Sequence, residues 1–466
     1  MNNKLIYIIT ILLSVGVFFV LPVYDDFYYL TAPHKFIDYN NLLPNGAFWR
    51  PIDAILGYII GRYPWAFPFI NHTIVIGSFA FAIFGLKYIL NYCHINKLTL
   101  SISLAFFCLS PALVATTYSI DSSNQTMSLA LGIASLIVFQ KHKVSSYVLM
   151  IFALFSKESG IAWFAITPLL NMLMQKYHED NIKIDKHDFK PITKYWSISF
   201  IILAIYAIAR ISLNTQVDVG YDPSSRYSGG LGLNSITGLF ILLSLSTTTI
   251  DTIAMFLESN YFLLAISCIA SLLFVLVIGK KTIHQSKITI CLLLVSILAT
   301  ASPHLVMKRP GEMHLYPVLW TIALSIGILA AKVQWIKTEL VIIYCYLIVG
   351  IFVFIHKAVY IYNNGKIAET RVKTTLTQIV KTPKSIMVLD CDKQLKSYSV
   401  FQIDGKRCWD SGMGTRIYLD LENPQTVEYH IIKPSEQAYY LNIYYKSKNK
   451  FDACWIVNDN KVKVIY

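Results

Sequence analysis

Charged residues are scarce in this sequence. Of its 466 residues only 14% are Asp, Glu, Lys or Arg, whereas 55% are hydrophobic. A soluble domain cannot bury that much apolar surface, so the composition excludes an ordinary soluble enzyme and predicts a protein that lies mainly in lipid. The formal net charge of +13 implies no nucleic-acid partner, because Lys and Arg collect in cytoplasmic loops and beside anionic lipid in membrane proteins.

Several motifs are also missing. No two of the eight cysteines have the CxxC spacing of a metal site. The DxD spacing of metal-dependent nucleotide-sugar enzymes occurs at Asp390–Asp392, but that segment belongs to the hydrophilic C-terminal part, which we place outside the cytoplasm. The first apolar run is followed by Pro22 and Tyr24 rather than by a small-residue cleavage site, so we expect a retained span. We expect no metal and no cofactor.

Uncharged apolar runs predict about eleven membrane-spanning helices and therefore an α-helical polytopic fold. Each run has the apolar character that a helix needs in a bilayer. The expected spans are 5–23, 66–90, 98–115, 125–140, 144–156, 160–175, 195–213, 261–279, 288–303, 315–331 and 339–356. The predicted transmembrane domain is therefore 1–356.

The distribution of lysine decides how two ambiguous stretches are interpreted. Residues 144–175 form either one long helix or a hairpin broken at Ser156–Gly160, and residues 236–257 form either a span or an interfacial helix. Lysines crowd the loops 176–194 and 280–287. Both loops are cytoplasmic, as the positive-inside rule requires, only if the first stretch is a hairpin and the second does not cross.

The resulting topology has the N-terminus in the cytoplasm and places the loops 24–65 and 214–260 outside, together with a soluble domain over 357–466. In that domain the hydrophobic runs shorten and polar turns separate them, which predicts a small β-rich or α/β fold. The runs are Ser385–Leu389, Glu428–Ile432 and Leu441–Tyr445. The abundance of Ile, Lys, Asn and Tyr is typical of an AT-rich bacterial genome, so we expect a bacterial inner membrane and a periplasmic domain.

Three cysteines, Cys391, Cys408 and Cys454, fall in the terminal domain. In an oxidising periplasm two of them could form a disulfide, and the sequence does not say which. The alternative is three reduced, buried thiols.

Ionisable residues gather at the external mouths of the expected spans, where they are costly and tend to be functional. They are Asp25, Asp26, Arg50, Asp121, Lys157, Glu158, Arg226, His304, Lys308, Arg309 and His314. Carboxylates and cations on one membrane face suit a transfer in which a carboxylate takes a proton from an acceptor hydroxyl while cations hold a departing phosphate.

Three of these features resemble the polytopic glycosyltransferases of the GT-C class: Asp25–Asp26 directly after the first span, Arg50–Pro51 in the first loop, and Ser156–Glu158 at an external hairpin. The resemblance covers roughly residues 1–330. The size, the layout of spans and the terminal domain are also similar to the bacterial O-antigen glucosyltransferases of serotype conversion. The resemblance implies transfer of a sugar, glucose in the narrower match, from a polyprenyl-phosphate donor to a glycan acceptor such as lipopolysaccharide O-antigen.

The resemblance also implies roles by position. Asp25 or Asp26 is the base, Lys157 contacts the donor phosphate and Glu158 orients the site. Arg50, Arg226, Lys308 and Arg309 are further phosphate-binding candidates, and Asp121 and His314 support them. For the cations Arg50, Lys308 and Arg309 the alternative is an anchor to lipid headgroups. For Lys157 and Glu158 it is an ordinary hairpin tip with a mutual ion pair, and for the aspartates a helix cap and a solvated side chain.

The chemistry implied is metal-independent, because Lys and Arg can neutralise a lipid monophosphate leaving group. A single carboxylate that deprotonates the acceptor predicts inversion at the anomeric carbon. The alternatives are an O-antigen polymerase, which would concentrate its charges in long central loops, and a lipid-linked sugar transporter or flippase. A transporter would usually show internal repeats and charged or broken helices at mid-membrane. The sequence has no internal repeat, and its spans are nearly free of charge apart from Arg210.

Overall fold

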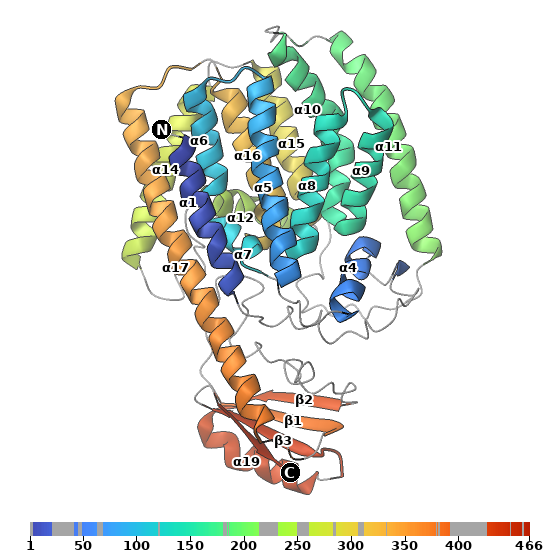
Figure 1. Ribbon diagram of the computed structural model, residues 1–466, viewed down its shortest axis with the longest axis vertical. Helices are drawn as coiled ribbons and strands as arrows, with labels where there is room; N and C mark the ends of the chain where they lie inside the picture. The colour runs from blue at the N-terminus through green and yellow to red at the C-terminus, as the bar shows by residue number, and fades with distance from the viewer. Residues whose placement is uncertain are drawn as a thin grey trace.

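The structure is a computed structural model, in which a helical bundle is followed by a small sheet (Figure 1). It describes residues 3–20, 42–44, 49–62, 69–119, 122–179, 184, 186–213, 232–248, 261–282, 286–305, 312–331, 333–378, 380, 383–391, 426–447, 449–458 and 461–466. Most of these residues are helical, as expected where backbone polar groups must be satisfied within the segment.

Each of the eleven apolar runs of the sequence contains an α-helix among its described residues. The corresponding helices are α1 (Asn3–Val15), α5 (Phe69–Tyr92), α6 (Lys97–Cys108), α8 (Ser123–Val138), α9 (Lys143–Ser156), α10 (Ala162–His178), α11 (Lys186–Ser212), α14 (Tyr261–Thr282), α15 (Lys287–Leu305), α16 (Tyr316–Leu329) and α17 (Lys337–Leu376). Shorter elements lie between them: α4 (Pro51–Arg62), α7 (Val114–Thr117), α12 (Leu233–Thr247) and the 3₁₀ segments η1 (Gly16–Phe19), η4 (Pro111–Leu113), η6 (Glu158–Ile161) and η7 (Glu312–Leu315).

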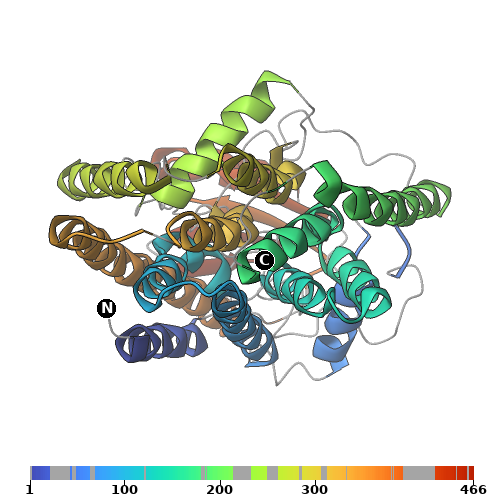
Figure 2. The same ribbon diagram turned by 90° about the horizontal axis from the view of Figure 1, so that it is seen from above.

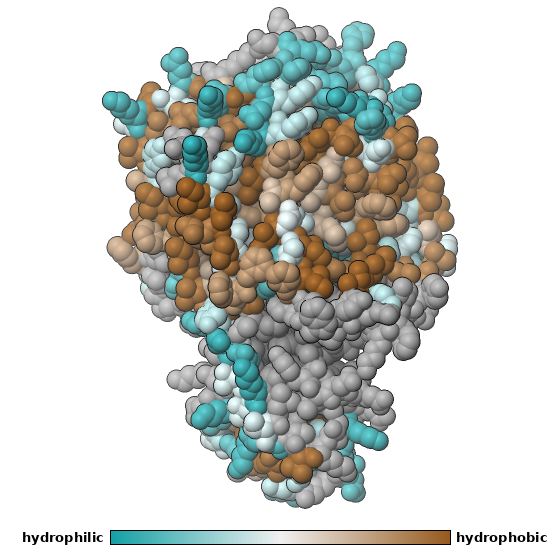
Figure 3. Space-filling view, viewed as in Figure 1, coloured by the Kyte–Doolittle hydropathy of each residue, from teal (hydrophilic) through white to brown (hydrophobic). Residues whose placement is uncertain are grey.

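Six helices of the described chain are long and apolar enough to cross a membrane. They cover Phe69–Tyr92, Lys97–Thr117, His187–Ser212, Ala265–Thr282, Lys287–Leu305 and Lys337–Asn363. The helices α1, α8, α9, α10 and α16 are shorter. Figure 3 shows a hydrophobic band across the visible face of the bundle and hydrophilic residues at the end away from the sheet. The fold is thus compatible with a multi-pass membrane protein.

The predicted break within 144–175 is confirmed. Helix α9 ends at Ser156, Lys157 is extended (φ −156°, ψ 142°), and η6 leads directly into α10. The amide of Lys157 donates to Ala153 O (3.1 Å) and that of Gly160 to Lys157 O (2.8 Å). A Cβ atom on Gly160 would lie 2.3 Å from the carbonyl carbon of Ala153, so the tight return of the chain requires glycine.

Part of the other ambiguous stretch, 236–257, is the helix α12, whose 15 residues do not reach the length of the six long helices. In Figure 2, where most helices of the bundle are seen nearly end-on, α12 is inclined across the bundle. The remainder of that stretch, from residue 249, lies outside the described residues.

Helix α17 connects the bundle to the sheet. Its 40 residues run unbroken through the expected domain boundary at residue 357, so the helix extends about 60 Å and leaves the bundle before it ends (Figure 1). Just beyond it, Gln378 forms two hydrogen bonds with the edge strand β4 (Lys461–Ile465): its Nε2 donates to Val462 O (2.6 Å) and its Oε1 accepts from Val464 N (2.9 Å). The sheet is therefore attached directly to the end of the helix.

The terminal sheet has the strand order β2-β1-β3-β4. Strand β1 (Ser385–Asp390) pairs in parallel with β2 (Thr426–Ile431) and β3 (Ala453–Asn458), and β3 pairs with β4 as an antiparallel hairpin. One sheet face packs against the helix α19 (Gln437–Lys446) and the other has its own apolar cluster around Trp455. The expectation of a small α/β domain thus holds for the described residues.

Of the three short hydrophobic runs in this domain, Leu441–Tyr445 lies inside the helix α19 rather than in a strand. Its apolar side chains follow helical spacing, with Tyr440, Leu441 and Tyr444 packed on the sheet, and the preceding turn is capped by Glu436 Oε2, which accepts from Lys433 N (2.9 Å).

Cys391 and Cys454 are both buried and both free. The register aligns Cys454 with Met387, four residues before Cys391, so the two positions are separated by about 13 Å along the ladder, too far for a disulfide. Cys408 lies outside the described residues.

Candidate functional site

The candidate site begins at the N-terminus of α4, a helix within the loop 24–65 that follows the first apolar run. Pro51 takes the first helical position, and the carbonyl of Arg50 accepts the amide of Ala54 (3.0 Å). Trp49 fixes this start, because its ring stacks on Tyr206 of α11 (centroids 5.0 Å apart, planes at 16°) and its Nε1 donates to Leu42 O (2.9 Å). The helix N-terminus is thus pinned to the bundle by an aromatic contact.

The Arg50 guanidinium binds the carboxylate of Glu158 at the tip of the α9–α10 hairpin. Its Nε lies 2.9 Å from both carboxylate oxygens of Glu158, and its Nη2 lies 2.6 Å from Oε2. The two side chains are about one-fifth and one-quarter exposed. Such a two-point contact fixes direction as well as distance. The carboxylate at the hairpin tip is therefore bound by the first loop.

The charge on Glu158 is set by two opposing effects. Burial alone would raise the pKa of this carboxyl, but the Arg50 guanidinium and the neighbouring Lys157 outweigh it and hold the pKa below its usual range. Glu158 is thus ionised at neutral pH. Its negative charge lies between two cations, which orients Arg50 and leaves the cluster of three residues with a net positive charge.

His304 and His314 lie next to this cluster. Their ring centroids are 4.6 Å apart, and both side chains are almost fully buried. Lys157 and Glu158 both act electrostatically on His304. Within the described part of the chain, His304 Nε2 has no hydrogen-bond partner, so a substrate hydroxyl or phosphate oxygen that reached it would supply a bond that the fold does not.

A buried ion pair lies at the start of η7. Glu312 Oε1 and Lys357 Nζ are 2.5 Å apart, with side chains only 2% and 1% exposed. The pair ties the segment that carries His314 to α17, because Glu312 and His314 belong to the same 3₁₀ turn. The long helix that bears the terminal sheet is thus bonded directly to the wall of the candidate site.

A third polar group lies where α4 meets α8. Asn124 Nδ2 is 3.4 Å from Asp53 Oδ2, in the first turn of α4. The first turn of α8 is entirely polar yet buried, and it comprises Ser122, Ser123, Asn124, Gln125 and Thr126. Buried polar residues at this end of the bundle extend the site beyond the ionisable residues that the sequence singled out.

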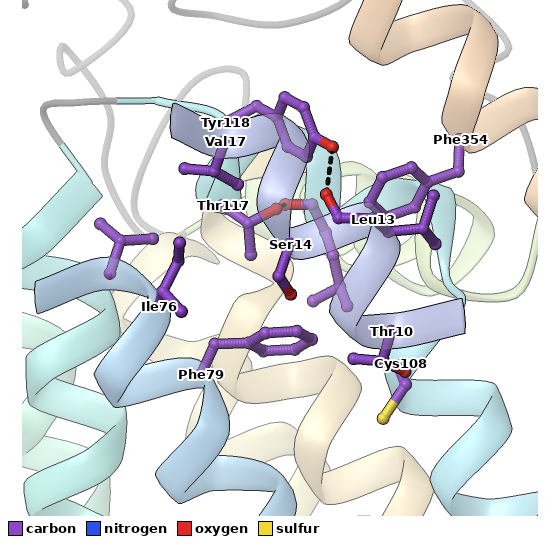
Figure 4. A pocket seen from close by; sticks show the side chains of 12 residues that line it. Thr10, Leu13, Ser14, Val17, Ile76, Phe79, Cys108, Thr117, Tyr118 and Phe354 are labelled. Atoms are coloured by element: carbon purple, nitrogen blue, oxygen red, sulfur yellow. Dashed lines mark hydrogen bonds between the residues drawn. The ribbon is translucent and has the colours of Figure 1, made fainter. Parts of the chain in front are cut away.

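A small cavity lies on the other side of the bundle end, between α1, α5, α7 and α17 (Figure 4). Its wall includes Thr10, Ser14 and Tyr118, and the Tyr118 hydroxyl donates to Leu13 O (2.5 Å). With a volume of about 10 Å³ it has room for roughly one water molecule and none for a sugar ring. We therefore do not assign it to substrate.

The structure brings together five of the residues singled out from the sequence, namely Arg50, Lys157, Glu158, His304 and His314. Helix α4, which begins directly after Arg50, lies at the bundle end that faces the sheet (Figure 1). The other six lie outside the described residues: Asp25, Asp26, Asp121, Arg226, Lys308 and Arg309. Their roles stay predictions.

Sequence reasoning missed Tyr206 and Lys357 as parts of the site, and it gave no role to Glu312. Arg210, one turn after Tyr206, acts on the Tyr206 hydroxyl together with Arg50. A signal existed for Lys357, and for Arg210 beside Tyr206, because both are basic residues within or at the end of apolar runs, where an ionisable side chain needs a partner.

Comparison with known proteins adds no name to this arrangement. No family model, no curated protein and no solved structure matches the chain. Among the described residues, no three His, Cys, Asp or Glu side chains are grouped closely enough to hold a metal ion. Any functional assignment must therefore rest on the site's own chemistry.

Proposed function

We propose that the chain is a bacterial membrane glycosyltransferase of the GT-C type. It transfers a sugar from a polyprenyl-phosphate donor to a glycan acceptor such as O-antigen. The observation that carries the proposal is the Arg50–Glu158 contact beside Lys157, at one end of an apolar bundle. A net positive, partly buried cluster at that position suits a lipid phosphate, whose tail lies in the bilayer while its charge stays at the interface.

In the proposed topology eleven helices cross the inner membrane, with the N-terminus in the cytoplasm and the terminal sheet in the periplasm. The positive-inside rule supports this orientation. Helices α10 and α14 end, and α11 begins, at the bundle end away from the sheet (Figure 1), and these helix ends carry Lys176, Lys190, Lys280 and Lys281.

In the proposed reaction the acceptor hydroxyl oxygen attacks the anomeric carbon of the donor sugar. The new glycosidic bond forms as the bond from that carbon to the phosphate oxygen breaks, and polyprenyl phosphate leaves with the bonding electrons. Asp25 or Asp26 takes the hydroxyl proton. Lys157 stabilises the leaving phosphate, and Glu158 holds Arg50 beside it. Attack opposite the leaving group inverts the anomeric configuration, and the chemistry requires no metal.

The test is transfer by the purified full chain in lipid nanodiscs, with radiolabelled polyprenyl-phosphate sugars and lipopolysaccharide as acceptor. We expect Asp25→Asn or Asp26→Asn to lower transfer at least about tenfold, in line with loss of a general base. Asp188→Asn is the matched control, because Asp188 pairs with Lys176 at the opposite bundle end. If neither aspartate matters, the proposed base is wrong. If labelled donor crosses the bilayer without a new glycosidic bond, the protein is a flippase instead.

A further inference from the structure

The terminal sheet carries a continuous aromatic and charged surface, which we call the tyrosine surface. It consists of Glu428 and His430 on β2, Tyr439 and Tyr440 on α19, and Lys450. We propose that the tyrosine surface binds the sugar rings of a polymeric glycan, the acceptor chain. This inference rests on the proposed function, because it names how that function's acceptor is held.

The rings form the stacking part of this surface. Tyr439 is 66% exposed, although it lies on a helix that packs against the sheet. Its ring stands edge-on to that of Tyr440 (centroids 5.4 Å apart, planes at 87°), and Tyr440 in turn lies 5.1 Å from the His430 ring. An apolar ring face held open to water by neighbouring rings gains free energy when the C–H face of a sugar covers it.

The polar part of the surface is equally ordered. The Glu428 carboxylate accepts a hydrogen bond from Lys450 Nζ (2.6 Å) through Oε2, and its Oε1 lies 2.8 Å from His430 Nε2. The hydrogen bond from Lys450 lowers the pKa of Glu428, so the carboxylate is charged at neutral pH. Each oxygen has a second acceptor position, and Lys450 is more than half exposed. Fixed acceptors and donors beside aromatic rings match a ligand that presents hydroxyl groups next to apolar ring faces.

The location of the surface selects a polymer over a small sugar. The apolar part of α17 ends at Asn363, and the helix continues for thirteen residues, or about 20 Å, before the sheet begins. The described candidate site lies at the bundle end, on the near side of that extension (Figure 1). A glycan that contacts both the sheet and the site must span the extension. A chain of sugars can do so, whereas a single sugar cannot.

The test measures glycan binding by the full chain in nanodiscs without any donor. The probe is lipid-free O-polysaccharide released from lipopolysaccharide by mild acid, compared with its single repeating unit. We expect wild type to bind the polymer more tightly than the unit. Tyr439→Ala should weaken polymer binding roughly fivefold through loss of stacking, and Glu428→Gln should also weaken it. Tyr439→Phe keeps the ring and should bind within about twofold of wild type.

The matched control is Tyr445→Ala, which removes a 51% exposed tyrosine of the same helix whose ring neighbour is Tyr444 rather than Tyr440. It should change binding by less than about twofold. The inference is overturned if wild type does not bind the polymer, if Tyr439→Ala binds like wild type, or if Tyr445→Ala loses as much. The binding assay contains no donor, so it is independent of the transfer assay. If the chain binds the polymer as expected but transfers no sugar, only the proposed function is contradicted. If it transfers sugar but does not show this binding pattern, only this inference is contradicted.

Discussion

The guanidinium of Arg50 and the carboxylate of Glu158 bind each other across 108 positions of sequence, and they thereby join the loop that follows the first helix to the tip of a helical hairpin. We expect Arg50→Ala or Glu158→Gln to lower sugar transfer on the order of 100-fold, because a shift of about 1 Å in a positioning group has that effect. Transfer kinetics in nanodiscs measure it.

The reciprocal double variant Arg50→Glu/Glu158→Arg separates positioning from charge. It should recover part of the transfer lost in the single variants, since it restores the contact in reverse. Lys176→Ala is the matched control, because it breaks an ion pair of similar exposure, Lys176–Asp188, that joins α10 to α11 and is not part of the candidate site. Equal transfer by wild type and Glu158→Gln would contradict the assigned role.

The depressed pKa of Glu158 predicts an acid-side loss of stability. Its contribution to folding is fully present above the unfolded value of 4.5, and it disappears as the pH falls through the lower folded value. Thermal unfolding of the detergent-solubilised chain should therefore show a Tm that falls below about pH 4.5. The Tm of Glu158→Gln should fall less over the same pH range. If the Tm of the two proteins falls equally with pH, the Glu158 carboxylate is not the source of the acid-side loss of stability.

The α9–α10 hairpin should depend on the absence of a side chain at residue 160. Gly160→Ala places a carbon 2.3 Å from the Ala153 backbone, so the turn must open, at about 1–3 kcal/mol of stability. Because Lys157 and Glu158 lie in that turn, transfer should fall as well. Gly77→Ala is the matched control: it lies in helix α5 with open space around the added carbon, and it should leave the Tm unchanged or raise it slightly.

Removing one member of the buried pair Glu312–Lys357 should lower the free energy of unfolding more than replacing both members with apolar residues. Either Glu312→Gln or Lys357→Met leaves a partner buried without its counter-charge, and we expect a loss of about 3–5 kcal/mol. The double variant Glu312→Leu/Lys357→Met should regain much of that loss. Chemical unfolding monitored by tryptophan fluorescence tests this. A double variant less stable than both single variants would show that the pair contributes net stability.

The positions of the helices could be predicted from the sequence because lipid allows few alternatives: an apolar run must satisfy its own backbone. The hairpin at Ser156–Gly160 also followed from charge alone, since the lysine-rich loops 176–194 and 280–287 could both be cytoplasmic only with an extra turn there. Contacts between distant residues could not be predicted. Nothing in the pattern around Arg50 indicates Glu158 as its partner, because that pairing depends on how α4 packs against α9.

Short elements were the other source of error. Helix α4 carries Asp53 and Arg62 within 12 residues, so it has no long apolar run that would reveal it. In α19 the run Leu441–Tyr445 fits a strand as well as a helix, and the cap at Glu436 decides between them. At Lys357 the composition changes but α17 continues, because lysine and the polar residues that follow it are compatible with a helix.

The continuity of α17 has a consequence for how the chain can change in length. Each residue inserted between Asn363 and Leu376 turns the attached sheet by about 100° and moves it about 1.5 Å away from the bundle. Seven residues bring the sheet back to within about 20° of its original direction, at an added distance of about 10 Å. Because Gln378 fastens the helix end to β4, no loop absorbs the rotation there. An insertion or deletion in this helix therefore keeps Tyr439 facing its original direction only if its length is close to two full helical turns, or about seven residues.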